Sequence, residues 1–335
     1  MLAAFTELKY AQKVKQYLLK HKLLDFNHQP VKELGYIYFS ITKKSKIPNA
    51  KMVNTKFKFP DKEIPLTVES LLKNKLTKNQ LQILPKSQET VGSILILEIP
   101  EKLIPKEKIV AEAYLSLHKN ITTVVKKDQI HSGVFRTRKV KILAGKRTKE
   151  TTHLENGIRL KLHLEKTYFS AKSGNERLRV AKQIKKGENV LVLFSGAGPF
   201  PLVFAKHSPA AKIFGVELNP AAHQFALHNV ALNKINNITL IHGDANLVVS
   251  KIKQKFDRIA MPLPKTGEQF LGIALKKAKP NAIIHLYSFL HETEIAAYTK
   301  KIKEISQNQV KILRKVKCGQ FSPGTFRMCF DMKVL

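Results

Sequence analysis

Cysteine and tryptophan are almost missing from this sequence, which contains Cys318, Cys329 and no tryptophan. Two cysteines without a C-x-x-C pattern or a matching histidine spacing do not support a zinc site or a disulfide framework, so we predict no metal site. No apolar run approaches the roughly 20 residues that a membrane helix requires. The first residues lack the basic and apolar parts of a signal peptide. We therefore expect a cytoplasmic protein without membrane contact.

Acidic residues are also scarce. The chain has 59 lysines and arginines against 25 aspartates and glutamates, a net charge of +34. Such a surplus attracts polyanions, because binding to phosphates releases counterions. A lysine-rich source proteome would be another explanation, but it would raise the acidic count as well. We predict a nucleic acid as the partner, and a monomer with no obligate protein partner.

Arginine is rare among the basic residues, with nine in the whole chain and none before position 136. A guanidinium presents a planar fork that lysine does not imitate, which suits base edges, phosphates and carboxylates. We therefore expect the stretch from 136 to 179 to contact base edges, phosphates or carboxylates that a guanidinium binds and lysine does not. Its six arginines are Arg136, Arg138, Arg147, Arg159, Arg177 and Arg179.

Hydrophobic patterns divide the 335 residues into three α/β domains. Residues 1–62 combine a helical period over 10–18 with a strand at 36–41, which predicts a small basic module. Residues 68–166 carry strands at 93–99 and 121–125 around a helix at 106–117, followed by a hairpin with Asn156-Gly157 at its turn. Residues 167–335 alternate apolar strands with helices, which predicts a Rossmann-like parallel sheet covered on both faces. The expected strands are 189–194, 213–218, 238–242, 258–261 and 282–289, with a final hairpin at 310–316 and 326–334; the expected helices are 221–234, 268–277 and 292–305.

A glycine-containing turn follows the first of these strands. Gly196 and Gly198 let the backbone approach a ligand, and Glu217 stands 19 residues after Gly198, where a carboxylate can accept both ribose hydroxyls. A tight turn without a ligand is the structural alternative. The third glycine of a dinucleotide site is replaced by Pro201. The pattern therefore predicts a nucleoside cofactor without a pyrophosphate, and S-adenosylmethionine fits because it has no phosphate.

Two further segments carry candidate substrate contacts. The turn Met261-Pro262-Leu263-Pro264-Lys265 follows the fourth strand, where a stiff wall can lie against a planar base; an ordinary loop is the alternative. Segments 135–138 and 168–177 bring together arginine forks, an aromatic ring and the carboxylate of Glu176, a combination suited to an unstacked base. Glu176 and Arg177 could instead simply open a helix and pair with neighbours.

These segments together resemble the archaeal and eukaryotic tRNA guanine-37 N1-methyltransferases, a class I methyltransferase family. The resemblance covers nearly the whole chain. It is carried by Lys13-Val14-Lys15 to Phe39, Phe135-Arg136-Thr137-Arg138-Lys139, Leu143-Ala144-Gly145, Glu155-Asn156-Gly157, Tyr168-Phe169-Ser170, Glu176-Arg177, Gly196-Ala197-Gly198-Pro199-Phe200, Asn219-Pro220, Leu263-Pro264-Lys265 and Ser322-Pro323-Gly324.

The resemblance implies a role for each domain and for individual residues. The first domain would sense the outer corner of tRNA, the middle domain would grip the anticodon stem, and the last would bind the methyl donor. Glu176 would be the general base and Arg136 would hold the guanine O6. The predicted donor contacts are Arg177, Phe194, Ser195, Gly196, Gly198, Glu217, Leu218, Asp244, Ala245 and Pro262; the predicted substrate contacts are Arg138, Tyr168, Lys172, Pro264 and Lys265.

The sequence thus predicts N1 methylation of guanosine 37 in tRNA with S-adenosylmethionine as donor. Guanine N1 carries a proton at neutral pH, so a base must remove it while a cation steadies the charge on O6. One alternative is a wybutosine-pathway enzyme on the same scaffold, which transfers an aminocarboxypropyl group or methylates the tricyclic base. Another is a noncatalytic RNA-binding relative, which donor binding would distinguish.

Overall fold

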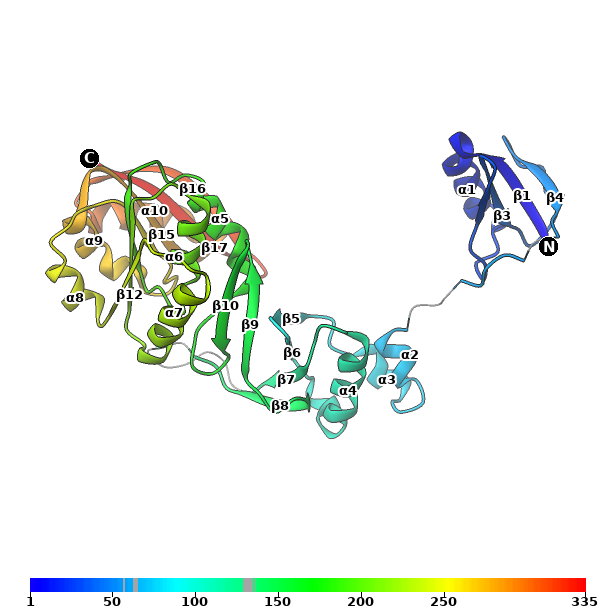
Figure 1. The fold of residues 1–335 in the computed structure, drawn as a ribbon, viewed down its shortest axis with the longest axis horizontal. Coiled ribbons are helices and arrows are strands. Elements are labelled where there is room, and N and C mark those ends of the chain that lie inside the picture. The colour runs from blue at the N-terminus through cyan, green and yellow to red at the C-terminus, as the bar shows by residue number, and fades with distance from the viewer. Residues whose placement is uncertain (57, 63–65, 129–134, 136) are drawn as a thin grey trace. The chain divides into compact units, whose positions relative to one another are not determined.

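The structure is a computed structural model that describes all residues except 57, 63–65, 129–134 and 136. It forms two compact units, Met1–Thr67 and Val68–Leu335, and each is considered by itself (Figure 1). The two later domains expected from the sequence therefore pack together into one unit. Among the described residues, no helix has the length and apolarity needed to cross a membrane.

The first unit is an antiparallel sheet with one helix packed on it. The strand order is β2-β3-β1-β4, and Val14 and Leu18 of the helix are buried against Ala4 and Phe39 of the sheet. The helix and the strand predicted at 36–41 are confirmed, whereas β1 was not foreseen. The elements are β1 (Leu2–Glu7), η1 (Leu8–Tyr10), α1 (Ala11–Lys20), β2 (Val31–Glu33), β3 (Tyr36–Ser40) and β4 (Lys51–Asn54).

The second unit begins with a four-stranded mixed sheet in the order β5-β6-β7-β8. The two central strands are parallel and are joined through α4, whose Val110 and Tyr114 are buried in a core with Leu95 and Val124. The elements are α2 (Val68–Leu72), α3 (Lys78–Gln82), β5 (Gln88–Val91), β6 (Ile94–Leu97), η2 (Glu101–Lys106), α4 (Glu107–Leu117), β7 (Thr123–Lys127) and β8 (Val140–Gly145).

A hairpin of β9 (Glu150–Glu155) and β10 (Ile158–His163) follows, as predicted. Asn156 and Gly157 adopt φ values of +47° and +71° at its turn, the left-handed backbone that a two-residue hairpin loop requires. The buried face of β10 packs into the same core as the sheet that follows it in the chain. The sequence places this hairpin in the middle domain, whereas its packing and its position in Figure 1 put it between the two sheets of this unit.

A seven-stranded sheet fills the rest of the second unit in the order β13-β12-β11-β14-β15-β17-β16. Strands β11 to β15 are parallel, and β17 and β16 are antiparallel to their neighbours. This confirms the expected Rossmann-like arrangement and the closing hairpin. The strands are β11 (Asn189–Leu193), β12 (Lys212–Glu217), β13 (Ile238–His242), β14 (Phe256–Met261), β15 (Ala278–His291), β16 (Val310–Ser322) and β17 (Thr325–Val334).

Helices cover both faces of this sheet. Alternate residues of β11 point to opposite faces, so Val190 and Val192 join one hydrophobic core while Leu191 and Leu193 join the other. The continuous apolar strand is thus explained by burial on both sides. The helical elements are η3 (Ala171–Ser173), α5 (Gly174–Ala181), α6 (Pro199–His207), α7 (Pro220–Leu232), α8 (Ala245–Lys251), η4 (Gly267–Phe270), α9 (Leu271–Lys277), η5 (Glu292–Glu294) and α10 (Ile295–Ile305).

Candidate active site

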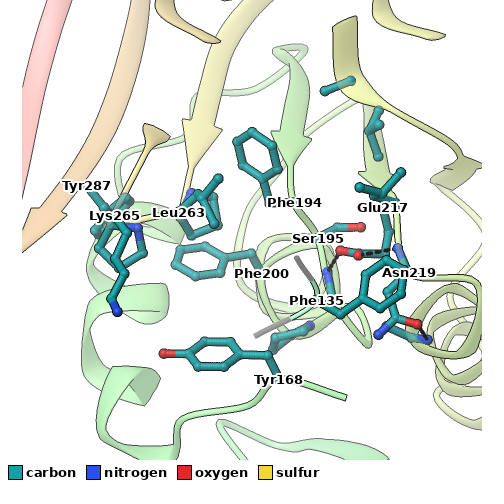
Figure 2. Close-up of a pocket in the computed structure, with 18 of the residues that line it drawn as sticks. Phe135, Tyr168, Phe194, Ser195, Phe200, Glu217, Asn219, Leu263, Lys265 and Tyr287 are labelled. Carbon is teal, nitrogen blue, oxygen red and sulfur yellow. Dashed lines mark hydrogen bonds between the residues drawn. The ribbon is translucent and has the colours of Figure 1, made fainter. Parts of the chain in front are cut away.

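A cavity of about 600 Å³ opens at the carboxyl ends of the parallel strands (Figure 2). It lies beside β11, whose neighbours β12 and β14 continue the sheet in opposite directions. Ligands of open α/β sheets bind at this kind of switch point. The loops after β11, β12, β13 and β14 all contribute to the lining, through Phe194, Glu217, Asp244 and Pro262 among others.

The turn after β11 shapes the first wall of the cavity. Phe194 and Gly196 both have φ +57°, so the backbone reverses sharply directly after the strand. Ser195 and Gly196, both predicted donor contacts, line the cavity. Gly198, with φ +87°, does not: a Cβ atom there would lie 3.4 Å from Leu202 and 3.5 Å from Ala226. Gly198, a predicted donor contact, therefore packs behind the wall against α6 and α7.

Glu217 ends β12 and points into the same wall. Its carboxylate accepts hydrogen bonds from the backbone N–H of Gly196 at 2.7 Å and of Asn219 at 2.8 Å. Burial raises the pKa of Glu217, and the backbone donors oppose that rise. These donors fix the carboxylate at the strand end, where its remaining lone pairs can accept hydroxyl groups.

The remaining polar groups in this part of the cavity fit a nucleoside. The buried hydroxyl of Ser195 has no hydrogen-bond partner among the described residues, so a ligand can supply one. Asp244 caps α8 by accepting from Asn246 N at 2.8 Å, and together with Leu218 and Ala245 it lines the cavity. A roomy apolar pocket with a few fixed polar groups is typical of a cofactor site.

The start of α6 argues against a phosphate. Pro199 is the first residue of this helix and Pro201 the third, and a proline has no backbone N–H. A helix N-terminus binds pyrophosphate through such N–H groups. The chemistry of the cavity therefore fits S-adenosylmethionine better than a dinucleotide, as the sequence predicted.

The opposite wall comes from the turn after β14 and from the segment before α5. Pro262, Pro264 and Lys265 line the cavity, as does Tyr168. The carbonyl of Pro264 accepts a hydrogen bond from Phe289 N at 2.9 Å, which ties the turn to β15. Figure 2 shows Tyr168 and Lys265 on one side of the cavity and Glu217 on the other. This wall is stiff and partly aromatic, in agreement with a site for a planar base.

Glu176 lies in the first turn of α5 and lines the cavity with only 5% of its surface exposed. Arg179 donates to both of its oxygens, from Nε to Oε2 and from an Nη to Oε1, each at 2.7 Å. The hydroxyl of Tyr287 donates to Oε1 at 2.7 Å. Three donors therefore hold the carboxylate in one orientation.

Arg177 also lines the cavity, but its guanidinium is engaged inside the protein. It forms a bidentate ion pair with Glu155 of the hairpin, with Nε 2.6 Å from Oε1, and it donates to the carbonyl of Ser170 at 3.1 Å. The ring centroids of Phe169 and Phe200 lie 5.3 and 5.7 Å from the guanidinium carbon. Arg177 is thus a rigid part of the cavity wall.

Other predicted substrate contacts do not gather at the cavity. Arg138 is buried, and its two Nη atoms donate to the two carboxylate oxygens of Glu89 at 2.7 and 3.2 Å. The guanidinium is therefore occupied by an internal partner. Lys172 is exposed and does not line the cavity. Arg136 lies outside the described residues. Phe135, from the segment that the sequence analysis singled out, does line the cavity. The structure adds Tyr287 of β15 and Arg327 of β17, which the sequence did not indicate.

The cavity combines a class I strand order with a glycine turn and a carboxylate at the end of the next strand, and the start of α6 does not suit a phosphate. These features define a class I methyltransferase that uses S-adenosylmethionine. Sequence models of known families agree with this. The TRM5/TYW2 methyltransferase domain matches residues 151–313, and the TYW2 N-terminal domain matches residues 68–148. The chain belongs to the TRM5/TYW2 methyltransferase family.

Individual relatives support this membership. The tRNA (guanine(37)-N(1))-methyltransferase Trm5b of Pyrococcus abyssi is 36% identical over 76% of this chain and 76% of its own length. The crystal structure of Pyrococcus abyssi Trm5b superposes with a TM-score of 0.80 at 31% identity, covering 100% of this chain and 99% of that one. The structure of aTrm5 with tRNALeu gives a TM-score of 0.74 at 25% identity and covers 100% of both chains.

A relative with a different reaction is also similar. The tRNA(Phe) (4-demethylwyosine(37)-C(7)) aminocarboxypropyltransferase of Pyrococcus horikoshii is 30% identical over 80% of this chain and 96% of its own length. Almost all of that enzyme is thus matched while a fifth of this chain is not. The Pyrococcus abyssi Trm5b structure, by contrast, covers 100% of this chain.

Proposed function

We propose that this protein methylates N1 of guanosine 37 in tRNA, with S-adenosylmethionine as the methyl donor. The observation that carries the proposal is the buried carboxylate of Glu176, held by Arg179 and Tyr287 in the wall of the donor cavity. Family membership and the full-length likeness to Trm5b agree with it. We further propose that the enzyme acts in the cytoplasm as a monomer with tRNA as its partner.

The reaction needs a proton acceptor. S-adenosylmethionine supplies an electrophilic methyl group on a sulfonium. The N1–H bond of guanine breaks as its proton passes to Glu176, and the freed electron pair takes the methyl group. The sulfonium charge disappears with the transfer and the carboxylate becomes neutral, so charge and protons balance. Arg136, which lies outside the described residues, is proposed to hold the guanine O6.

The remaining site residues have separate proposed roles. Glu217 and Ser195 hold the nucleoside part of the donor, with Phe194, Gly196, Leu218, Asp244, Ala245 and Pro262 around it and Arg177 as a rigid wall. Tyr168, Pro264 and Lys265 hold the acceptor nucleotide. Residues 1–62 and 68–166 are proposed to bind the body of the tRNA, and 167–335 to bind the donor.

Aminocarboxypropyl transfer is the second candidate, because the Pyrococcus horikoshii relative uses the same scaffold. Two observations favour methylation. The first unit, Met1–Thr67, precedes the match to the TYW2 N-terminal domain at 68–148, and the Trm5b structure covers the whole chain. In addition, Glu176 provides the base that an N1 proton requires.

Labelled donor distinguishes the candidates. The protein is incubated with transcripts of one tRNA carrying G or A at position 37, and with donor labelled either at the methyl carbon or at the carboxyl carbon. We expect methyl label on the G37 transcript only. Carboxyl label on the tRNA would indicate aminocarboxypropyl transfer, and methyl label on both transcripts or on neither would contradict the proposal.

The Glu176→Gln variant tests the base directly. Because a positioned general base contributes about 10² to 10⁴ in rate, we expect the single-turnover rate to fall by that factor while tRNA and donor affinities stay within a few-fold. Glu304→Gln is the matched control, since Glu304 is exposed on α10. A Glu176→Gln enzyme with the full single-turnover rate would show that this residue is not the base.

A further inference from the structure

A chain of buried and partly buried polar side chains runs from Glu176 through the sheet; its most exposed member is Arg179, whose side chain is 25% exposed. Arg179 contacts Glu176 on one side and Asp331 of β17 on the other, with Nη atoms 2.7 and 3.0 Å from the two Asp331 oxygens. Asp331 accepts from His285 Nδ1 at 2.6 Å. Asp331 and His285 are 2% and 0% exposed. Water therefore does not screen the charge of Asp331 or of His285, and both side chains are linked to Glu176 through Arg179.

The protonation state of each member follows from its partners. Arg258 lies 2.8 Å from His285 Nε2, and a guanidinium only donates, so Nε2 accepts and the proton sits on Nδ1. Burial lowers the pKa of His285, in agreement with a neutral ring. Burial would raise the pKa of Asp331, but hydrogen bonds from His285 and Arg179 hold it well below its usual range. Asp331 is therefore an anion and His285 a neutral donor.

Near Glu176 the tyrosine and the thiol are neutral and Arg177 is ion-paired, whereas Arg327 is a cation of the cavity wall that bonds to a hydroxyl. Burial raises the pKa of the Tyr287 hydroxyl and of the Cys329 thiol well above their usual ranges. Arg177 is neutralised by Glu155, Arg327 donates to Ser173, and Cys318 of β16 lies against Cys329. At the far end, Arg258 pairs with Glu188, with Nε 2.8 Å from Oε2.

The charge balance of the chain singles out Glu176. Glu188, Asp331 and Glu176 are three carboxylates, and Arg258 and Arg179 are two guanidiniums. Glu188 cancels Arg258 and Asp331 cancels Arg179, which leaves Glu176 as the excess negative charge. Proton uptake by Glu176 would make the buried chain neutral, a favourable change in a medium of low dielectric constant.

We propose that Arg179 and Asp331 are positioning residues for the Glu176 base. Arg179 fixes the carboxylate, and Asp331 cancels the guanidinium charge so that Glu176 keeps its capacity to take up a proton. Without Asp331, an unbalanced cation would favour the ionised carboxylate and make it a weaker base. Oε1 accepts from both Arg179 and Tyr287, so Oε2, with one donor among the described residues, is the oxygen that receives the proton. This inference rests on the proposed function.

Two isosteric variants should move the pH profile in opposite directions. In Asp331→Asn the uncompensated Arg179 should shift the acid limb of the single-turnover rate to lower pH by about 1 unit. It should also reduce the plateau rate roughly tenfold, because the base is weaker. In Tyr287→Phe the carboxylate loses one donor, so the limb should shift to higher pH. The KM for tRNA should stay unchanged in both variants.

Glu188→Gln is the matched control. It leaves Arg258 uncompensated, but the neutral His285 ring separates this cation from Asp331, so the variant should lower the melting temperature and move the pH profile much less than Asp331→Asn does. Acid limbs that coincide with the wild type, or that move in the same direction in both variants, would overturn the proposal. Calorimetry with S-adenosylmethionine checks that each variant is folded. If Asp331→Asn does not bind the donor, Tyr287→Phe becomes the deciding variant, and an acid limb that coincides with the wild type in Tyr287→Phe would overturn the proposal. A wild-type enzyme that does not methylate G37 would instead refute the proposed function.

Discussion

Half of the described arginine side chains in the second unit, four of eight, are held by internal carboxylates. Each of four described arginines forms an ion pair with a glutamate or aspartate that is at least partly buried, so its charge is balanced within the protein. Breaking such a pair leaves an uncompensated buried charge, which is strongly destabilising. The pairs are Arg138 with Glu89, Arg177 with Glu155, Arg179 with Glu176 and Asp331, and Arg258 with Glu188.

Glu217 is the residue on which donor affinity should depend most. Replacement by glutamine keeps the shape but removes the charge that strengthens hydrogen bonds to hydroxyl groups. Hydrogen bonds to charged groups contribute about 1.5–3 kcal/mol, so we expect the Kd for S-adenosylmethionine to rise roughly 10- to 100-fold in Glu217→Gln. Calorimetry measures this. Glu304→Gln should bind as the wild type does, and a Glu217→Gln affinity within twofold of the wild type would contradict the assignment.

At the scale of elements, the β9–β10 hairpin is fastened to α7 by two asparagines one helical turn apart. The side chain of Asn229 accepts from Lys161 N at 2.7 Å and donates to Lys161 O at 3.0 Å. Asn233 makes the same pair of bonds to Arg159, at 2.8 and 2.7 Å. Each amide thus completes one residue of β10 as a neighbouring strand would. This contact fixes the hairpin, and with it Glu155, beside the cavity.

The two asparagines should contribute unequally to stability. Asn229 is 0% exposed and also donates to Ala197 O, so Asn229→Ala leaves buried backbone groups without partners. An unsatisfied buried group costs about 1–3 kcal/mol, and we expect a total loss of roughly 2–4 kcal/mol. Asn233→Ala should cost under about 1 kcal/mol, because water reaches its exposed partners. Urea unfolding measures both, and equal losses would contradict this account of the contact.

At the scale of the whole molecule, basic charge dominates. The net charge of +34 belongs to a chain whose described carboxylates are largely paired with lysines or arginines. The surplus therefore consists of exposed lysines. Such a surface attracts a polyanion over a wide area with little sequence preference. Recognition of one nucleotide must then come from the cavity rather than from the charge.

One buried and three partly buried histidines should make the second unit sensitive to mild acid. Burial lowers the folded-state pKa of His153, His163, His223 and His285 below 6.5. Below that pH the unfolded chain binds more protons than the folded one, so stability is full above about pH 6.5 and falls as the pH decreases. We expect calorimetric melting temperatures to drop by several degrees between pH 7.5 and pH 5.

His153→Gln tests this account. His153 Nδ1 accepts from Gly92 N at 3.1 Å, and a glutamine oxygen can accept the same bond without titrating. The variant should therefore lose less melting temperature between these two pH values than the wild type. An identical loss would remove His153 from the explanation.

The sequence by itself determined the fold class, the cofactor and the family. Continuous apolar strands alternating with helices predict a parallel sheet covered on both faces, and a glycine turn followed by Glu217 at the next strand end indicates a ligand site there. The loss of the third glycine to Pro201 further excluded a dinucleotide. These signals are local, because each depends on residues that are close along the chain.

Only the tertiary structure decided which charged groups meet. Arg138, Arg177 and Arg179 are equivalent in the sequence as basic residues near the site, but carboxylates distant along the chain hold them in place: Glu89, Glu155 and Asp331. Tyr287 and Arg327 reach the cavity from β15 and β17, more than 100 residues after Glu176. Pairing of ions depends on distance in space, which strand order and helix packing set, and no local pattern encodes it.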